Sequence, residues 1–214
     1  MRGEEEIRMG GWRVSQEEKA LDLPRAVLLK PGRIERDGEG NVLDASSSVT
    51  LIIAGSRKIV VDTGKEEDRG VIRERLEDHG LSPDDVDLVI NTHDHPDHSG
   101  NNRLFSRAVV LSGEGDDSLK EGDVVAPGVW ILQTPGHTRG SISVVCESKR
   151  RIVMAGDALP LLGNYLKDLP PRLHVDRDLA EESMARIVGL ADLVVPGHDL
   201  PFLVRERRRV LSLD

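Results

Sequence analysis

Four side chains that can bind a metal ion lie within six consecutive positions near the middle of this chain. They are His93, His95, Asp97 and His98, and they follow the largely apolar run 86–90. Imidazole nitrogens and a carboxylate oxygen together suit zinc or a similar first-row metal. Because His93 and His95 are two positions apart, their side chains leave an extended segment on the same side. Pro96 then fixes φ and bends the chain, so that Asp97 and His98 can face a second point nearby.

Three further motifs with a histidine or an aspartate follow apolar, strand-like runs later in the chain. They read Thr134-Pro135-Gly136-His137, Met154-Ala155-Gly156-Asp157 and Val195-Pro196-Gly197-His198. A single histidine at the end of a strand is more often a hydrogen-bonded structural residue than a ligand. Here, however, five of the seven histidines occupy such motif positions. Together they indicate a metal centre.

These motifs, in their order and flanking residues, resemble the signature of the metallo-β-lactamase-fold hydrolases, and within them a small single-domain branch. The resemblance covers roughly residues 45–204. It implies an α/β (α+β) fold, a four-layer αββα sandwich with the metal site at one edge of the paired sheets. Periodicity alone supports only a mixed α/β protein with several strands.

The resemblance also implies a site for two divalent metal ions, with zinc favoured over iron or manganese. It puts His93, His95 and His137 on one ion, puts Asp97, His98 and His198 on the other, and makes Asp157 the bridge. It further implies that Asp62, in Asp62-Thr63-Gly64, orients the histidine loop. A plain turn-forming role for this aspartate is the alternative.

The implied activity is that of a metal-dependent hydrolase. Two metal ions would hold a bridging hydroxide at neutral pH and polarise the bond under attack. Asp97 is expected to be catalytic, because it can also handle the proton that passes to the leaving group. Lactamases of this fold usually lack a histidine at the position of His98. We therefore expect a small ester, thioester or lactone as substrate. Two alternatives stay open, a metal-dependent ribonuclease or phosphodiesterase and a non-haem iron redox enzyme on the same fold.

Substrate contacts are expected in the stretch 159–176, which has three prolines and little periodicity. A loop that long in a compact domain is usually functional. Its polar residues Tyr165, Lys167 and His174 are candidate substrate contacts, with a packed lid as the alternative.

Composition narrows the class of partner. The formal net charge of −9 at pH 7 favours a small-molecule substrate and disfavours nucleic acid and anionic membranes. The acidic start of the chain and the lack of a run of 18 apolar residues predict a cytoplasmic protein without a signal peptide or membrane span. The single cysteine, Cys146, lies in an apolar run and is expected to be buried. A homodimer is compatible with these features.

Two segments are expected along the chain, a loosely held N-terminal arm over residues 1–24 and a single domain over 25–214. Helices are predicted over 66–79 and 178–190, the latter with Asp178 as a cap, and another helix is predicted to begin within 99–105. A polar, Gly-rich loop is expected over about 30–48. Strands are predicted over 26–29, 49–54, 58–61, 86–90, 108–111, 129–133, 141–146, 151–155 and 193–195.

Overall fold

The structure is a computed structural model, and it describes residues 23–115 and 118–213. The N-terminal arm that the sequence predicts over residues 1–24 lies outside the described residues except for its last two positions. Within the described part of the chain, no helix is long and apolar enough to cross a membrane.

The first sheet has five strands in the spatial order β1-β4-β5-β6-β7. These are β1 (Arg25–Lys30), β4 (Val49–Ala54), β5 (Arg57–Val61), β6 (Leu88–Asn91) and β7 (Val109–Ser112). β4 is antiparallel to β1 and β5, whereas β5, β6 and β7 are parallel to one another. Parallel strands end at the same edge of a sheet, so the turn after β5 and the loop after β6 emerge side by side.

The second sheet has seven strands in the order β14-β13-β12-β11-β10-β9-β8. These are β8 (Val124–Ala126), β9 (Val129–Gln133), β10 (Ile142–Glu147), β11 (Arg151–Gly156), β12 (Leu193–Pro196), β13 (Phe202–Leu203) and β14 (Arg208–Arg209). Only β11 and β12 are parallel within it, and the helix α4 (Arg177–Leu190) lies in the connection between them. A parallel pair requires such a long crossover.

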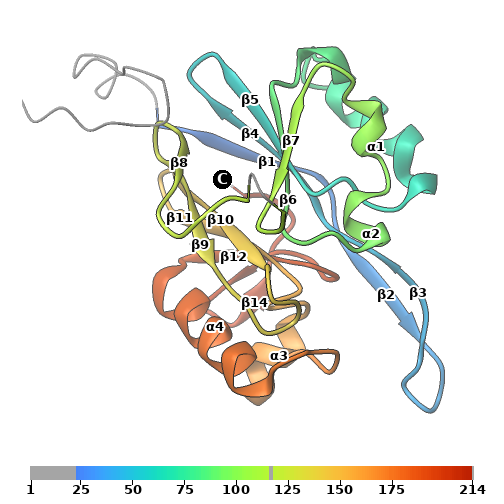
Figure 1. Ribbon diagram of the computed structural model, residues 1–214, viewed down its shortest axis with the longest axis vertical. Coiled ribbons are helices and arrows are strands. Elements are labelled where there is room, and N and C mark those ends of the chain that lie inside the picture. Colours follow the sequence, from blue (N-terminus) through green and yellow to red (C-terminus); the bar gives the residue numbers. More distant parts are fainter. Residues whose placement is uncertain (1–22, 116–117, 214) are drawn as a thin grey trace, which may run out of the picture.

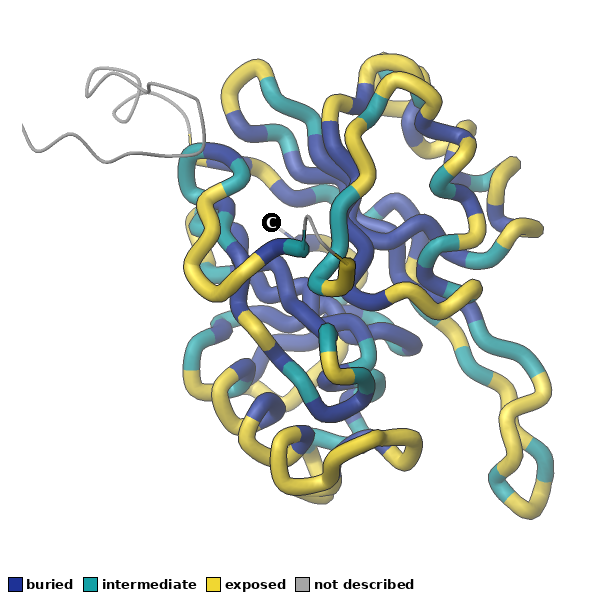
Figure 2. Tube along the Cα trace, viewed as in Figure 1, coloured by how far each residue is buried: buried dark blue, intermediate teal, exposed yellow. Residues whose placement is uncertain are grey.

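Helices cover the outer faces of the two sheets, which gives four layers (Figure 1). Because strand side chains alternate between faces, Ile52 and Ile59 enter the central cluster between the sheets, and Leu51 and Val60 enter the cluster under α1 (Arg69–Glu77). A third cluster joins the second sheet to α4. The buried strands form the interior of the molecule in Figure 2. This arrangement confirms the αββα sandwich.

Other predicted elements agree with the structure in kind and differ at their ends. The helix expected over 66–79 begins as the short 3-10 turn η2 (Glu66–Asp68) and continues as α1, and a second short turn, η3 (Pro83–Asp85), precedes β6. The helix α4 is capped by Asp176, whose side chain accepts a hydrogen bond from the Leu179 amide, rather than by Asp178. Cys146 is fully buried in the central cluster, as its apolar surroundings predict.

Besides the short strands β8, β13 and β14, which were not predicted, three regions differ from the sequence-based prediction. The polar stretch expected as a loop forms a separate hairpin of β2 (Arg33–Arg36) and β3 (Val42–Ser46), which projects from the body in Figure 1. The helix expected to begin within 99–105 is replaced by the single turns α2 (Pro96–Ser99) and η4 (Asn102–Leu104). The stretch 159–176 contains a short helix, α3 (Leu162–Lys167). Each of these segments lacks the apolar periodicity on which the predictions relied.

Candidate metal centre

Seven histidine and aspartate side chains from both sheets converge at one edge of the sandwich. His93 and His95 lie on the loop after β6, and Asp97 and His98 lie on α2, which follows at once. The second sheet contributes His137 after β9, Asp157 after β11 and His198 after β12. All seven follow the ends of strands, where loops carry functional groups in layered α/β folds.

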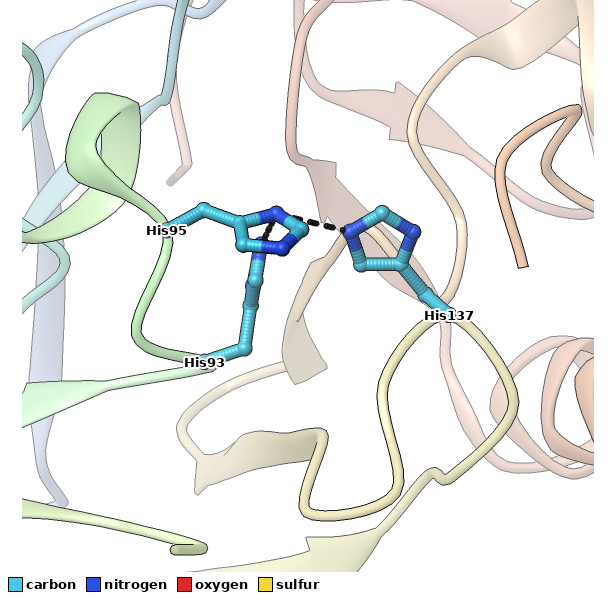
Figure 3. Close-up of side chains that lie close together, drawn as sticks. All are labelled: His93, His95 and His137. Carbon is cyan, nitrogen blue, oxygen red and sulfur yellow. Dashed lines mark hydrogen bonds between the residues drawn. The ribbon is translucent and has the colours of Figure 1, made fainter. Parts of the chain in front are cut away.

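Three histidines form the first group, in which one ring nitrogen of each lies within 4.8 Å of the others. The Nδ1 atom of His95 is 3.0 Å from Nε2 of His93 and 3.2 Å from Nε2 of His137 (Figure 3). Three imidazole nitrogens that point at one place are a common donor set for zinc.

Asp97, His98 and His198 form the second group, again with one donor atom each within 4.8 Å of the others. The Asp157 carboxylate lies between the two groups. Its Oδ1 is 3.4 Å from Nε2 of His98 and 3.1 Å from Nε2 of His198, and its Oδ2 is 3.6 Å from Nε2 of His137. One carboxylate thus faces both groups, as a bridging ligand must.

The hydrogen bonding fits metal ions at this place. Among the described residues, Nε2 of His98 and Oδ1 of Asp157 are buried and make no hydrogen bond of acceptable geometry. Leaving a buried polar atom without a partner costs about 1–3 kcal/mol, so such atoms need an explanation. A bound cation would satisfy both.

The other ring nitrogen of three of these histidines is held by the protein. Nδ1 of His98 lies 2.8 Å from Oδ2 of Asp62, and Asp62 also accepts a hydrogen bond from the Thr92 amide at 2.7 Å. Nδ1 of His137 donates to the Leu173 carbonyl at 2.7 Å. Nδ1 of His198 lies 3.1 Å from the Ser46 carbonyl. These contacts direct each Nε2 toward the centre.

Glycine permits the close approach of the last motif to Asp157. A Cβ atom at Gly197 would lie 2.1 Å from Oδ1 of Asp157, so any side chain there would displace this carboxylate. The Pro-Gly-His motif after β12 therefore needs glycine before His198.

Burial and neighbouring charges shift the pKa of several of these side chains. Burial is the main cause that lowers the pKa of His93, and burial also lowers the pKa of His95. Burial opposes the charge on His98, but Asp62 and Asp157 outweigh it and raise the pKa of His98 to about 10. Burial likewise opposes ionisation of Asp157, yet His198 and His98 hold the pKa of this carboxyl well below its usual range. His93 and His95 thus present neutral imidazoles, and the Asp157 carboxylate between the two groups is ionised.

The candidate substrate contacts lie on α3 and on the segment that follows it. The Tyr165 ring stacks on Phe202 at 5.8 Å, and its hydroxyl donates to the Val204 carbonyl at 3.3 Å, so the structure gives it a packing role in the cluster under α4. Lys167 and His174 are exposed. His174 lies next to Leu173, whose carbonyl holds His137.

The contacts of the Leu173 and Ser46 carbonyls with His137 and His198 were not predicted from the sequence. Every residue has a carbonyl, so residue type gives no signal for such contacts. Only the length of the 159–176 stretch pointed toward the first of them.

Comparison with known proteins agrees with this geometry. A family model described as "Metallo-beta-lactamase superfamily" matches residues 43–113. A probable metallo-hydrolase of Methanocaldococcus jannaschii is 41% identical over 146 residues, which cover 66% of this chain and 70% of that protein. Metallo-β-lactamase domain-containing protein 1 of Mus musculus is 34% identical over 222 residues and 84% of each chain. This last similarity agrees with the branch that the sequence motifs indicated.

Two further proteins extend the comparison. An N-acyl homoserine lactonase of Bacillus cereus is 31% identical over 163 residues, which cover 63% of this chain and 64% of that protein. A crystal structure from Thermotoga maritima, provisionally described as a metallo-β-lactamase, aligns with a TM-score of 0.68 at 21% identity. The alignment covers 85% of this chain and 100% of that one, and it bears on the fold alone.

Proposed function

Since the chain belongs to the metallo-β-lactamase superfamily, we propose that it is a metal-dependent hydrolase of a small ester, thioester or lactone. The observation that carries this proposal is the position of the Asp157 carboxylate between two groups of ligands. Such a carboxylate can hold two ions a short distance apart, which is the arrangement that dinuclear hydrolases need.

The ligand roles follow from the two groups. His93, His95 and His137 would hold one ion, Asp97, His98 and His198 would hold the other, and Asp157 would serve both. Zinc is the favoured metal because imidazole and carboxylate donors suit it, with iron and manganese as the other metals to test. When bound, two such ions supply Lewis acidity toward the scissile bond and a hydroxide at neutral pH.

Asp97 is the residue that we assign to proton transfer. Its side chain is 26% exposed, against 14% for Asp157, and its Oδ2 lies 3.5 Å from Nε2 of His198. A carboxylate at the open side of the site can take up a proton and pass it to a leaving group. Asp62 contacts Thr92 and His98 and orients the loop.

The substrate class has two supports. The similarity to a lactonase of Bacillus cereus favours attack at a carbonyl carbon. The formal net charge of −9 disfavours a polyanionic substrate such as RNA. Lys167 and His174 remain candidate substrate contacts, because both are exposed on the segment that is bonded to His137.

Elemental analysis of protein purified without added metal tests the proposal, together with one panel of p-nitrophenyl esters, thioesters, lactones and bis-p-nitrophenyl phosphate. We expect about two zinc ions per chain and hydrolysis of the carbonyl substrates. Cleavage of the phosphodiester alone would replace the proposal by a nuclease. Iron without any hydrolysis would replace it by a redox enzyme.

A further inference from the structure

Three consecutive serines, Ser46, Ser47 and Ser48, lead from the end of the hairpin β2–β3 to the start of β4. They also form hydrogen bonds with the loops of the candidate metal centre. All three are buried. The Ser46 carbonyl accepts from Nδ1 of His198 at 3.1 Å, and this nitrogen is shared with the Arg33 carbonyl at 3.2 Å. The Ser47 amide donates to the Asp97 carbonyl at 2.9 Å, and the Ser48 amide donates to the Gly197 carbonyl at 2.8 Å. This segment therefore bonds to the loops of both sheets that carry candidate ligands.

The buried ion pair of Asp68 and Lys30 forms hydrogen bonds with the serine segment. Asp68, at the end of η2, accepts hydrogen bonds from the Ser46 hydroxyl and, at 3.0 Å, from the Lys65 amide. Lys30 Nζ lies 3.7 Å from the same carboxylate oxygen and donates to the Ser47 carbonyl at 2.8 Å. Both side chains are buried, although neither belongs to the candidate ligand groups.

Two glycines let the backbone approach this pair and the last ligand. A Cβ atom at Gly64, whose φ is +64°, would lie 2.6 Å from Oδ2 of Asp68. A Cβ atom at Gly32 would lie 2.1 Å from the Gly197 carbonyl oxygen and 2.7 Å from Cα of His198. The backbone at Gly32, directly before β2, therefore lies in close contact with the backbone of the candidate ligand His198.

We infer that Asp68 is a positioning residue of the metal centre, which acts through Ser46 on the imidazole of His198. The Asp68 carboxylate fixes the Ser46 hydroxyl, and the carbonyl of the same serine holds Nδ1 of His198, so that Nε2 faces Asp157 and Asp97. The inference rests on the proposed function, since it assigns His198 to a metal ion.

The cost of burying charge supports this role. Taking a carboxylate and an ammonium group out of water is unfavourable, and their mutual attraction often fails to offset this cost. Well-packed apolar residues in place of Lys30 and Asp68 would stabilise the hairpin equally well. A buried pair placed behind a ligand is explained if the orientation of the ligand depends on it, because contacts of this kind commonly change metal affinity about 10–100-fold.

Metal affinity of two variants tests the inference. Ser46→Ala removes the hydroxyl and leaves the ion pair intact, and the double variant Lys30→Met/Asp68→Ala removes the pair without leaving one charge buried alone. We expect both to bind one of the two zinc ions about 10–100-fold more weakly in a chelator competition, while the other ion keeps its affinity. The cobalt(II)-substituted variants should show an altered absorption spectrum.

The matched control is Asp44→Ala/Lys65→Met, which removes another ion pair between the hairpin and η2. These side chains lie 2.6 Å apart, are 31% and 22% exposed, and do not belong to the ligand groups. The control should bind both ions like the parent.

Two outcomes would contradict the inference, and they can be told apart. If Ser46→Ala and the buried double variant keep the parent's affinity for both ions, Asp68 only stabilises the fold, even if the melting temperature falls. If the parent itself binds no divalent metal, the proposed function fails, and the inference fails with it.

Discussion

The edges of the two sheets contribute to the metal centre in different ways. The first sheet supplies four candidate ligands from one loop and the turn α2, within residues 93–98. The second supplies one candidate ligand from each of three loops, His137, Asp157 and His198. On the first edge, local chain geometry sets the spacing of the donors. On the second edge, strand pairing sets it, because the three residues are far apart in the sequence.

The contacts that orient the ligands differ in the same way. On the first edge the side chain of Asp62 holds His98 and the Thr92 amide. On the second edge backbone carbonyls hold His137 and His198. A substitution can therefore remove the orienting group of the first edge directly, whereas the second edge can be disturbed only through the segments that carry the carbonyls.

The largest effect is expected from His95→Ala on the first edge. His95 is exposed, so its loss creates no cavity in the core, but it removes one donor of the three-histidine group. We expect loss of metal and a drop in hydrolysis of roughly 10³-fold with the fold retained. Metal analysis and thermal unfolding of the same sample check this. An unfolded variant, or one that keeps its metal, would contradict the role of this loop.

Asp157→Asn tests the contribution of the second edge to both groups. An amide has one oxygen acceptor where the carboxylate has two, and it lacks the charge that faces His98 and His198. Occupancy should fall to about one metal ion per chain, measured after dialysis. Two ions retained would show that Asp157 is not the bridge.

Asp62→Asn sharpens the comparison, since it alters an orienting group and no ligand. The amide would disturb the hydrogen bond to His98, and metal affinity should fall about 10–100-fold. Chelator competition measures this loss. Asp85→Asn is a matched control, because Asp85 accepts from the Ser82 amide in an exposed turn away from the ligands. If the two variants bound metal with equal affinity, Asp62 would not be an orienting residue of the site.

The smallest effect is expected from Tyr165→Phe. The substitution removes a hydroxyl that bonds to the Val204 carbonyl and leaves the ring stacked on Phe202. Unfolding free energy should fall by about 1 kcal/mol, with KM unchanged. Denaturant unfolding and steady-state kinetics test the two parts separately. A several-fold rise in KM would instead indicate that Tyr165 contacts the substrate.

Much of the fold followed from local patterns. The strands β4, β5 and β9 to β12 could be located because each is a short, largely apolar run that is buried along most of its length. The pairing of the sheets in four layers could not be read from periodicity, and it was expected only because of the family resemblance. The hairpin β2–β3 was missed, because its mostly exposed strands carry no such pattern.

The sequence by itself determined which residues can bind metal, since the spacing of His93, His95, Asp97 and His98 and the three later motifs restricts the donors to one place. Tertiary structure alone decided how these donors are held. The carbonyls of Leu173 and Ser46 and the buried pair of Lys30 and Asp68 become orienting contacts only when distant segments pack together. The physical reason is that a backbone carbonyl has no residue type, and a buried ion pair has no fixed spacing along the chain.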